Sequence, residues 1–360
     1  NTTGNKMFIG GDDIVYQYST GSFYFPTGYQ PVHTTASIDT TYWTDINSMT
    51  ADQNAGDGEV YYAISTDDRT TWSVIDNTDG ERDIVRNNAG TWQYNSNGTY
   101  ASETWVNGAT NTELATLAEA MEGASSVVGA FDVSTASYVQ NFSVTSQEAS
   151  PHGITFNNDG TKMYIVGNTD DEVNEYTLST AFDVSTAAFS QNFSVAAQDL
   201  SPESIAFSND GTKMFITGDA GNDVNEYTLS TAFDISTASF VDSFSVASQE
   251  TSPFGIAFNT DGTKMFIVGT SSVSVNEYTL STGFDVSTAT YSQNFSVSSQ
   301  DTLPTGVAFN SDGTKMFVTG FSGKDVNEYA LSTGFDVSTA AFVDSFSVSS
   351  QDTAPRGIAF

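Results

Sequence analysis

Few residues in this sequence have the types needed for acid–base, nucleophilic or metal chemistry. The 360 residues include two histidines, His33 and His152, and no cysteine, beside 44 aspartates and glutamates. The histidines belong to different parts of the chain, so the sequence does not assemble a Ser/His/Asp triad. Zinc-type sites need several His or Cys ligands, and nothing singles out two carboxylates for glycoside hydrolysis. The sequence therefore predicts no catalytic residue, no metal site, no cofactor and no enzymatic activity.

One set of acidic residues recurs in short polar turns, each directly before a glycine. These are Asp159, Asp210, Asp261 and Asp312. Oxygen-rich turns can hold Ca²⁺, but the ligand spacing of an EF-hand loop and its distant glutamate are absent. Asp and Gly also form tight turns without a metal. We interpret these aspartates as turn formers.

A second recurring set pairs a lysine with a glutamate on the next predicted strand. The pairs are Lys162 with Glu175, Lys213 with Glu226, Lys264 with Glu277, and Lys315 with Glu328, while Lys6 meets Gln17 instead. A catalytic pair need not recur in every repeat, whereas a structural cross-strand ion pair would. We predict a structural role for all of them.

A sequence repeat positions these residues. The glycines of the turns, Gly160, Gly211, Gly262 and Gly313, lie 51 residues apart. In the first copy the pattern predicts strands at 153–156, 162–166, 173–178 and 189–195, joined by Asp-Gly and Ser/Thr turns. Four-stranded units that repeat at this period are typical of β-propeller blades.

The two ends of the chain complete one further repeat. Residues 355–360 (PRGIAF) stop after the first strand of a unit, and residues 1–11 (NTTGNKMFIGG) resume at the turn. The spacing from Gly313 across this join to Gly4 again equals one period. The sequence therefore predicts an all-β, five-bladed propeller closed by N- and C-terminal strands.

The closing repeat is interrupted by a long insertion. Its third strand, 14–18, should continue into the string AFDVST, which appears only at residue 130. The predicted domains are a propeller of residues 1–20 and 130–360 and an inserted β-rich subdomain of residues 21–129. The insertion contains all four tryptophans and predicted strands at 59–65, 70–76, 83–86, 91–94 and 101–106. Apolar residues at helical spacing predict one helix at 111–122.

Residues 65–72 (STDDRTTW) resemble the Asp-box hairpin of sialidases and other propellers, with Arg69 where that motif has glycine. Asp-boxes are folding motifs remote from the active site in those enzymes. The resemblance implies a hairpin here and no catalytic group.

The copies of the repeat differ most at two places, which supply the candidate ligand-binding residues. The residue after the proline that enters the innermost strand is different in each copy: His152, Glu203, Phe254, Thr305 and Arg356. The loop between the second and third strands also varies, and it contributes Phe321 and Lys324. In a propeller both places lie at one mouth of the central channel, opposite the insertion. A varied rim on a fixed frame is typical of a binding surface, and neutral drift of exposed loops is the alternative.

The charge of the chain excludes some partners. Its formal net charge is −34, from 44 acidic and 10 basic residues. Such a surface repels the phosphates of nucleic acids and anionic membranes, so we expect no nucleic-acid partner. No apolar run approaches the roughly 20 residues of a membrane helix, so we expect no membrane insertion. No signal peptide is visible in the sequence, which begins with Asn1.

The repeat SPxGIAFNxDGTKMFIVG, followed by DVNEYTLSTAFDVSTA, resembles the repeats of YVTN- and TolB-type propellers. This pattern and the segment 61–105 are similar to those of repeat-bearing, tail-fibre-like structural proteins of marine bacteriophages. The resemblance implies an extracellular or virion appendage. Its expected task is non-enzymatic recognition of a glycan or cell-surface protein, with the insertion contacting other structural subunits.

Two alternatives to recognition stay open. One is a secreted hydrolase or lactonase acting at the central channel, and the other is an architectural spacer in a filament. An enzyme should show two or three convergent buried carboxylates or a metal in the channel. A binding module should show a shallow aromatic and polar rim around Phe254 and Phe321.

Overall fold

The structure is a computed structural model that describes residues 6–11, 14–19 and 131–360, together with the backbone of five short strands between residues 62 and 109. Its internal contacts divide the chain into two compact units. The first comprises Asn1–Ser22 and Gly129–Phe360, and the second is Phe23–Val128.

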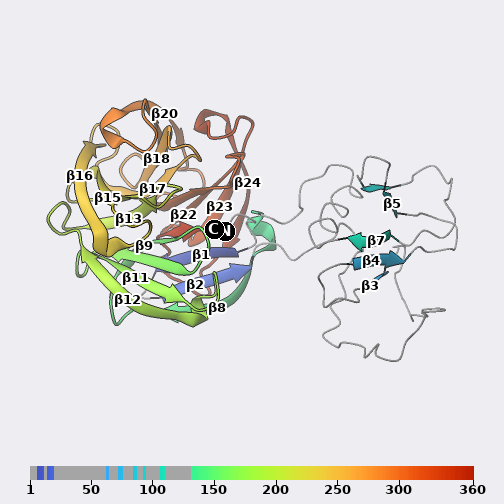
Figure 1. Ribbon diagram of the computed structural model, residues 1–360. Coiled ribbons are helices and arrows are strands. Elements are labelled where there is room, and N and C mark those ends of the chain that lie inside the picture. The colour runs from blue at the N-terminus through green and yellow to red at the C-terminus, as the bar shows by residue number, and fades with distance from the viewer. Residues whose placement is uncertain are drawn as a thin grey trace. The chain divides into compact units, whose positions relative to one another are not determined.

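The first unit is a five-bladed β-propeller of four-stranded antiparallel sheets (Figure 1). Four blades are continuous in sequence. The first contains β9 (Pro151–Phe156), β10 (Lys162–Gly167), β11 (Glu172–Leu178) and β12 (Ala187–Ser194). The second contains β13 (Pro202–Phe207), β14 (Lys213–Gly218), β15 (Asp223–Leu229) and β16 (Ala238–Ser245). The third contains β17 (Pro253–Phe258), β18 (Lys264–Gly269), β19 (Ser274–Leu280) and β20 (Ala289–Ser296). The fourth contains β21 (Pro304–Phe309), β22 (Lys315–Gly320), β23 (Asp325–Leu331) and β24 (Ala340–Ser347).

The fifth blade, here the closing blade, joins strands from both ends of the sequence. Its sheet order is β25-β1-β2-β8. The four strands are β25 (Ile358–Ala359), β1 (Lys6–Gly11), β2 (Ile14–Ser19) and β8 (Ser137–Ser143). In the antiparallel pairing of β25 with β1, Phe8 faces Ala359 and Ile9 faces Ile358. The predicted five blades and their closure by N- and C-terminal strands are confirmed.

Five strands fall within the predicted insertion. β3 (Tyr62–Ile64), β4 (Trp72–Ile75) and β7 (Val106–Ala109) form one sheet, and β5 (Ile84–Arg86) pairs with β6 (Trp92–Tyr94). β3, β4, β5 and β6 lie within their predicted ranges. β7 begins at Val106, the last residue of its predicted range, and Val106 pairs with Val74 of β4. β3 and β4 are antiparallel neighbours, as in an Asp-box hairpin, while residues 65–71 and the predicted helix at 111–122 lie outside the described residues.

Apolar side chains of adjacent blades make the core. Five clusters of buried residues lie between neighbouring blades. In one of them Val166 and Val173 pack with Met214 and Ile216 of the next blade. Each fully buried side chain of this size contributes roughly 1.5–3 kcal/mol. Because each blade covers the apolar face of its neighbour, stability depends on the complete ring.

The innermost strands β9, β13, β17, β21 and β25 approach one another closely around the axis (Figure 1). A Cβ atom on Gly306 would lie 2.6 Å from the carbonyl oxygen of Arg356, and one on Gly153 would lie 2.7 Å from the Cα of Ser204. A side chain at Gly306 or Gly153 would therefore clash with the backbone of the adjacent blade. The residue just before each of these positions is the variable one.

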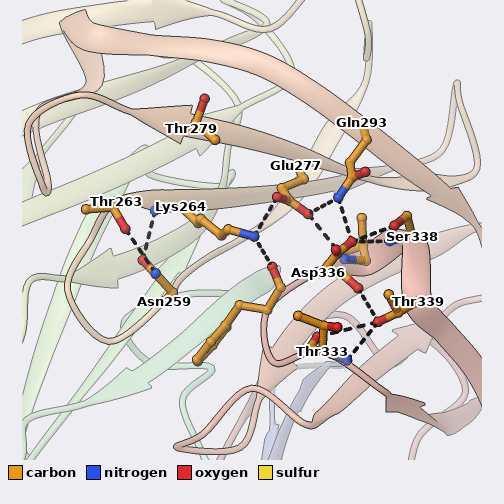
Figure 2. Close-up of polar contacts among 12 residues, drawn as sticks. Asn259, Thr263, Lys264, Glu277, Thr279, Gln293, Thr333, Asp336, Ser338 and Thr339 are labelled. Carbon is orange, nitrogen blue, oxygen red and sulfur yellow. Dashed lines mark hydrogen bonds and ion pairs between the residues drawn. The ribbon is translucent and has the colours of Figure 1, made fainter.

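Polar contacts join each blade to the next, and we call this set the inter-blade latch (Figure 2). In the third blade the Nζ of Lys264 lies 2.8 Å from Oε1 of Glu277 and donates to the carbonyl of Phe335 in the fourth blade, at 2.6 Å. The other carboxylate oxygen of Glu277 accepts from the backbone N–H of Val337 at 3.2 Å and from Gln293 at 2.9 Å. The predicted ion pair is confirmed, and it also binds the neighbouring blade.

A short 3-10 helix in the receiving blade presents the backbone groups of the latch. These helices are η2 (Val133–Thr135), η3 (Val184–Thr186), η4 (Ile235–Thr237), η5 (Val286–Thr288) and η6 (Val337–Thr339). Asp336 caps η6 by accepting from the N–H and hydroxyl of Ser338. Before it, Phe335 has a φ of 56°, which is unfavourable for a bulky residue.

The Asp-Gly turn accommodates this strained phenylalanine. Gly313 has a φ of 71°, and a Cβ there would lie 2.2 Å from the Phe335 ring. The adjacent Asp312 accepts from the N–H and hydroxyl of Thr314, at 2.9 and 2.6 Å. These hydrogen bonds lower the pKa of Asp312. The interpretation of the four aspartates as turn formers is confirmed.

Latches run around the whole ring. The other lysines donate to carbonyls of the next blade, from Lys162 to Phe233, from Lys213 to Phe284, from Lys315 to Phe131 and from Lys6 to Phe182. In the closing blade Gln17 takes the glutamate position and accepts from the N–H of Val184 and from Gln140. The Lys315 contact and the bond from the Val133 N–H to Glu328 join the fourth blade to the closing blade.

We expect Glu277→Ala to lower the free energy of unfolding by about 3 kcal/mol. It removes the buried acceptor of the Val337 N–H and the partner of Lys264, and the value is at the low end of the usual range because the Lys264 side chain stays 26% exposed. Glu277→Gln is the matched control, since Gln17 already serves this position in the closing blade. It should cost only about 1 kcal/mol. Urea unfolding measures both, and equal losses would contradict the latch.

Candidate binding site at the channel mouth

Contacts bring together four of the five residues that vary at the start of the innermost strands. Nδ1 of His152 pairs with Oε2 of Glu203 in the next blade. The His152 ring lies 6.4 Å from the ring of Phe254, and the guanidinium of Arg356 lies 5.8 Å from the Phe254 ring centroid. Thr305 donates from its hydroxyl to the carbonyl of Pro355, at 3.0 Å. These residues line one mouth of the channel.

Two serines extend the buried pair. Oγ of Ser150 lies 3.1 Å from Nε2 of His152, and the Ser201 hydroxyl donates to Oε1 of Glu203 at 3.2 Å. Each serine lies two residues before its partner, directly before the strand begins. The sequence pattern Ser-Pro-His and Ser-Pro-Glu carried this signal, but the contact between blades was not visible in it.

Burial separates the five residues into two groups. The exposed fractions of His152, Glu203 and Thr305 are 3%, 4% and 4%, whereas Phe254 and Arg356 are partly exposed. The sequence pattern had placed all five on an exposed ring. The innermost strands converge at the axis, so their side chains cover one another. Of the five residues, Phe254 and Arg356 are therefore the two that a ligand can reach.

The variable loop between the second and third strands lies at the same end of each blade. In the fourth blade Gly320 pairs with Pro304, and the N–H of Phe321 donates to the carbonyl of Leu303. Phe321 is 39% exposed, and Lys324 is partly exposed with a φ of 54°. These two candidates therefore stand beside the strand that carries Thr305.

Buried carboxylates that the sequence analysis did not single out hold these loops. They follow the fourth strand of each blade at Glu148, Asp199, Glu250, Asp301 and Asp352. Asp301, for example, accepts from the N–H of Leu303 at 2.6 Å and from the N–H of Gly323 at 2.8 Å. A Gln-Asp or Gln-Glu pair recurring with the repeat period was the available signal. The loops vary in sequence on a fixed set of backbone hydrogen bonds.

In two blades a second acidic residue lies near the buried carboxylate: Asp223 near Asp199, and Asp325 near Asp301. Asp223 and Asp325 each accept a hydrogen bond from the side-chain amide two residues on, Asn225 or Asn327, at 2.9 Å. Burial raises the pKa of Asp223, and the charge of Asp199 adds to the shift. Burial likewise raises the pKa of Asp325. Their negative charges therefore oppose folding at neutral pH.

Of the five variable residues only Glu203 is a carboxylate, and its partner is His152. Within residues 6–11, 14–19 and 131–360, no group of three or more His, Asp or Glu residues could hold a metal ion. A recess at the opposite end of the propeller is lined by Asp210, Lys213 and Phe284. Its charged groups already bond to Thr212 and Glu226. In the same part of the chain no helix is long and apolar enough to span a membrane.

No family model matches the chain, and no curated protein matches it. A functionally unknown protein from Desulfotomaculum acetoxidans has a solved structure that is similar over 95% of this chain and 80% of its own, with 14% identity and a TM-score of 0.41. A chain of the nidogen/laminin complex is similar over 63% of this chain and 89% of its own, with 12% identity and a TM-score of 0.40. Likeness at this level carries no argument about function, and the fold rests on the sheet topology.

We expect Asp223→Asn to raise the melting temperature at pH 7. The folded-state pKa of Asp223 lies above its ordinary value of 3.8, so ionisation disfavours the folded state above that pKa, and the penalty disappears below pH 3.8. Asparagine keeps an oxygen for Asn225 and removes the charge. The gain should therefore be present at pH 7 and vanish at pH 3.

Asp242→Asn, which removes the same charge from an exposed position on β16, is the control. It should leave the melting temperature nearly unchanged at both pH values. A gain of equal size for both variants would assign the effect to the net charge of the protein and contradict the local explanation.

Proposed function

We propose that this propeller is a recognition module of an extracellular or virion appendage and binds a glycan or a cell-surface protein through the channel mouth. The observation that carries the proposal is the Phe254 and Arg356 pair. It is partly exposed at the mouth of a scaffold whose strands and Asp-Gly turns recur from blade to blade. Recognition of this kind requires no catalytic group.

The pair suits an acidic partner. An aromatic face offers apolar contact to a sugar ring or side chain, and the neighbouring guanidinium offers paired donors to a carboxylate or sulfate. Of the basic residues in the propeller, Arg356 and Lys324 are the two that take no part in a latch. Both lie at the mouth end. In a chain of net charge −34, these cations provide a local attraction for an anionic ligand.

Other features support the setting of the proposal. The repeat resembles YVTN- and TolB-type propellers and structural proteins of marine bacteriophages, which favours an extracellular or virion location. The chain leaves the closing blade after Ser19 and re-enters it at η2, at the end opposite the β1–β2 turn. We propose that the insertion contacts neighbouring structural subunits. A spacer without a ligand is the competing function.

The experiment is a glycan array probed with the full chain, with carboxylated, sulfated and neutral glycans compared, and a binding assay on whole cells. We expect binding to an anionic glycan or cell-surface protein. Arg356→Gln should weaken it about tenfold or more through loss of charge-assisted hydrogen bonds. Phe254→Ala should weaken it through loss of the aromatic face.

Ser190→Ala changes an exposed residue on the outermost strand β12 and should bind like the parent chain. Unchanged binding by Arg356→Gln and Phe254→Ala would show that the ligand binds elsewhere than at the mouth. If no glycan and no cell is bound, the recognition function is wrong and the spacer function is favoured.

A further inference from the structure

We propose that Ser150 is an activated nucleophile that attacks carboxylic esters, with His152 as its general base. Glu203 is the residue that positions His152 and stabilises its positive charge after it takes the proton. The three side chains form one hydrogen-bonded chain at the channel mouth: Oγ of Ser150 lies 3.1 Å from Nε2 of His152, and Nδ1 of His152 pairs with Glu203. Nothing in the recognition function requires this arrangement.

The protonation of His152 follows from its partners. An ionised Glu203 carboxylate can only accept, so with it Nδ1 of His152 carries a proton and donates it. In the neutral imidazole Nε2 is then the acceptor, and the hydroxyl of Ser150 donates to it. This is the tautomer that a serine nucleophile needs. The other oxygen of Glu203 accepts from Ser201, which fixes the carboxylate in place.

Burial strengthens the arrangement. The exposed fractions of His152 and Glu203 are 3% and 4%, so water competes little for their hydrogen bonds. Ser150 itself is partly exposed. A base shielded by the protein beside a partly exposed serine is the geometry expected of a reactive serine.

The equivalent positions of the other blades show that the repeat does not require this chain of contacts. Ser201 precedes Glu203 and Ser252 precedes Phe254, so neither serine has a histidine two residues on. In the two remaining repeats leucine and alanine, at Leu303 and Ala354, replace the serine. The Ser-His-Glu set therefore occurs once in the ring, where the β9–β12 and β13–β16 blades meet.

The reaction balances with water as the only co-reactant. Oγ of Ser150 bonds to the acyl carbon while its proton moves to Nε2 of His152. The ester C–O bond breaks, and the alcohol leaves with that proton. Water then attacks the acyl-serine and gives a proton to Nε2 of His152. The bond between the acyl carbon and Oγ breaks, Nε2 returns the proton to Oγ of Ser150, and the carboxylic acid leaves. Esters with good leaving groups are the substrates that this nucleophile and base alone can convert.

The first test uses a fluorophosphonate probe on the full chain, with the adduct located by mass spectrometry, and 4-nitrophenyl acetate hydrolysis as the second readout. We expect the adduct on Ser150 and release of 4-nitrophenol. Ser150→Ala should abolish both, and it is small enough to leave the fold intact. Ser252→Ala changes the equivalent residue of the third blade and should react like the parent chain.

The roles of the other two residues need readouts that a loss of structure would not reproduce. His152→Ala should slow the reaction by about 100-fold or more, and added imidazole should restore part of the rate. Glu203→Gln keeps an oxygen for Nδ1 but lacks the charge that stabilises the imidazolium, so it should lower the turnover rate with little change in KM. No adduct on the folded parent chain, or an adduct that persists in Ser150→Ala, would overturn the proposal.

Discussion

A buried carboxylate that accepts hydrogen bonds from the neighbouring blade is the interaction on which the propeller depends. Glu277 accepts from Lys264, Gln293 and the N–H of Val337 together, and removing it would take the acceptor from the buried Val337 N–H and the ion-pair partner from Lys264. Apolar packing between blades provides the larger part of the stability but has little direction. The latch sets how one blade sits on the next, because its bonds are made to fixed backbone groups.

The latch also explains residues that look unrelated in the sequence. The strained phenylalanine supplies the carbonyl for lysine, the aspartate after it caps the 3-10 helix, and the glycine of the Asp-Gly turn leaves space for the phenylalanine ring. A backbone conformation as unfavourable as that of Phe335 persists only where several contacts determine it. The end of each blade that carries the Asp-Gly turn therefore joins that blade to its neighbours.

The mouth end of each blade does not form the latch, and the residues that differ between the repeats lie there. There the buried Asp301 and its equivalents hold the loops by backbone N–H groups, so the loop side chains are free to differ. The close approach of the innermost strands brings His152, Glu203, Phe254 and Arg356 into contact although they come from four repeats. Binding through Phe254 and Arg356 and reactivity at Ser150 would both use this division of roles.

The sequence by itself determined the blade. A period of 51 residues, the alternation within each strand and the Asp-Gly turns predicted four-stranded repeats, and the matching ends predicted closure of the ring. These are local or periodic properties, which a sequence records directly. Only the tertiary structure decided what faces what: that Lys264 reaches Phe335, that Glu203 meets His152, and that three of the five variable residues are buried. Such contacts join residues of different repeats, and the angle between blades sets them, which no local pattern encodes.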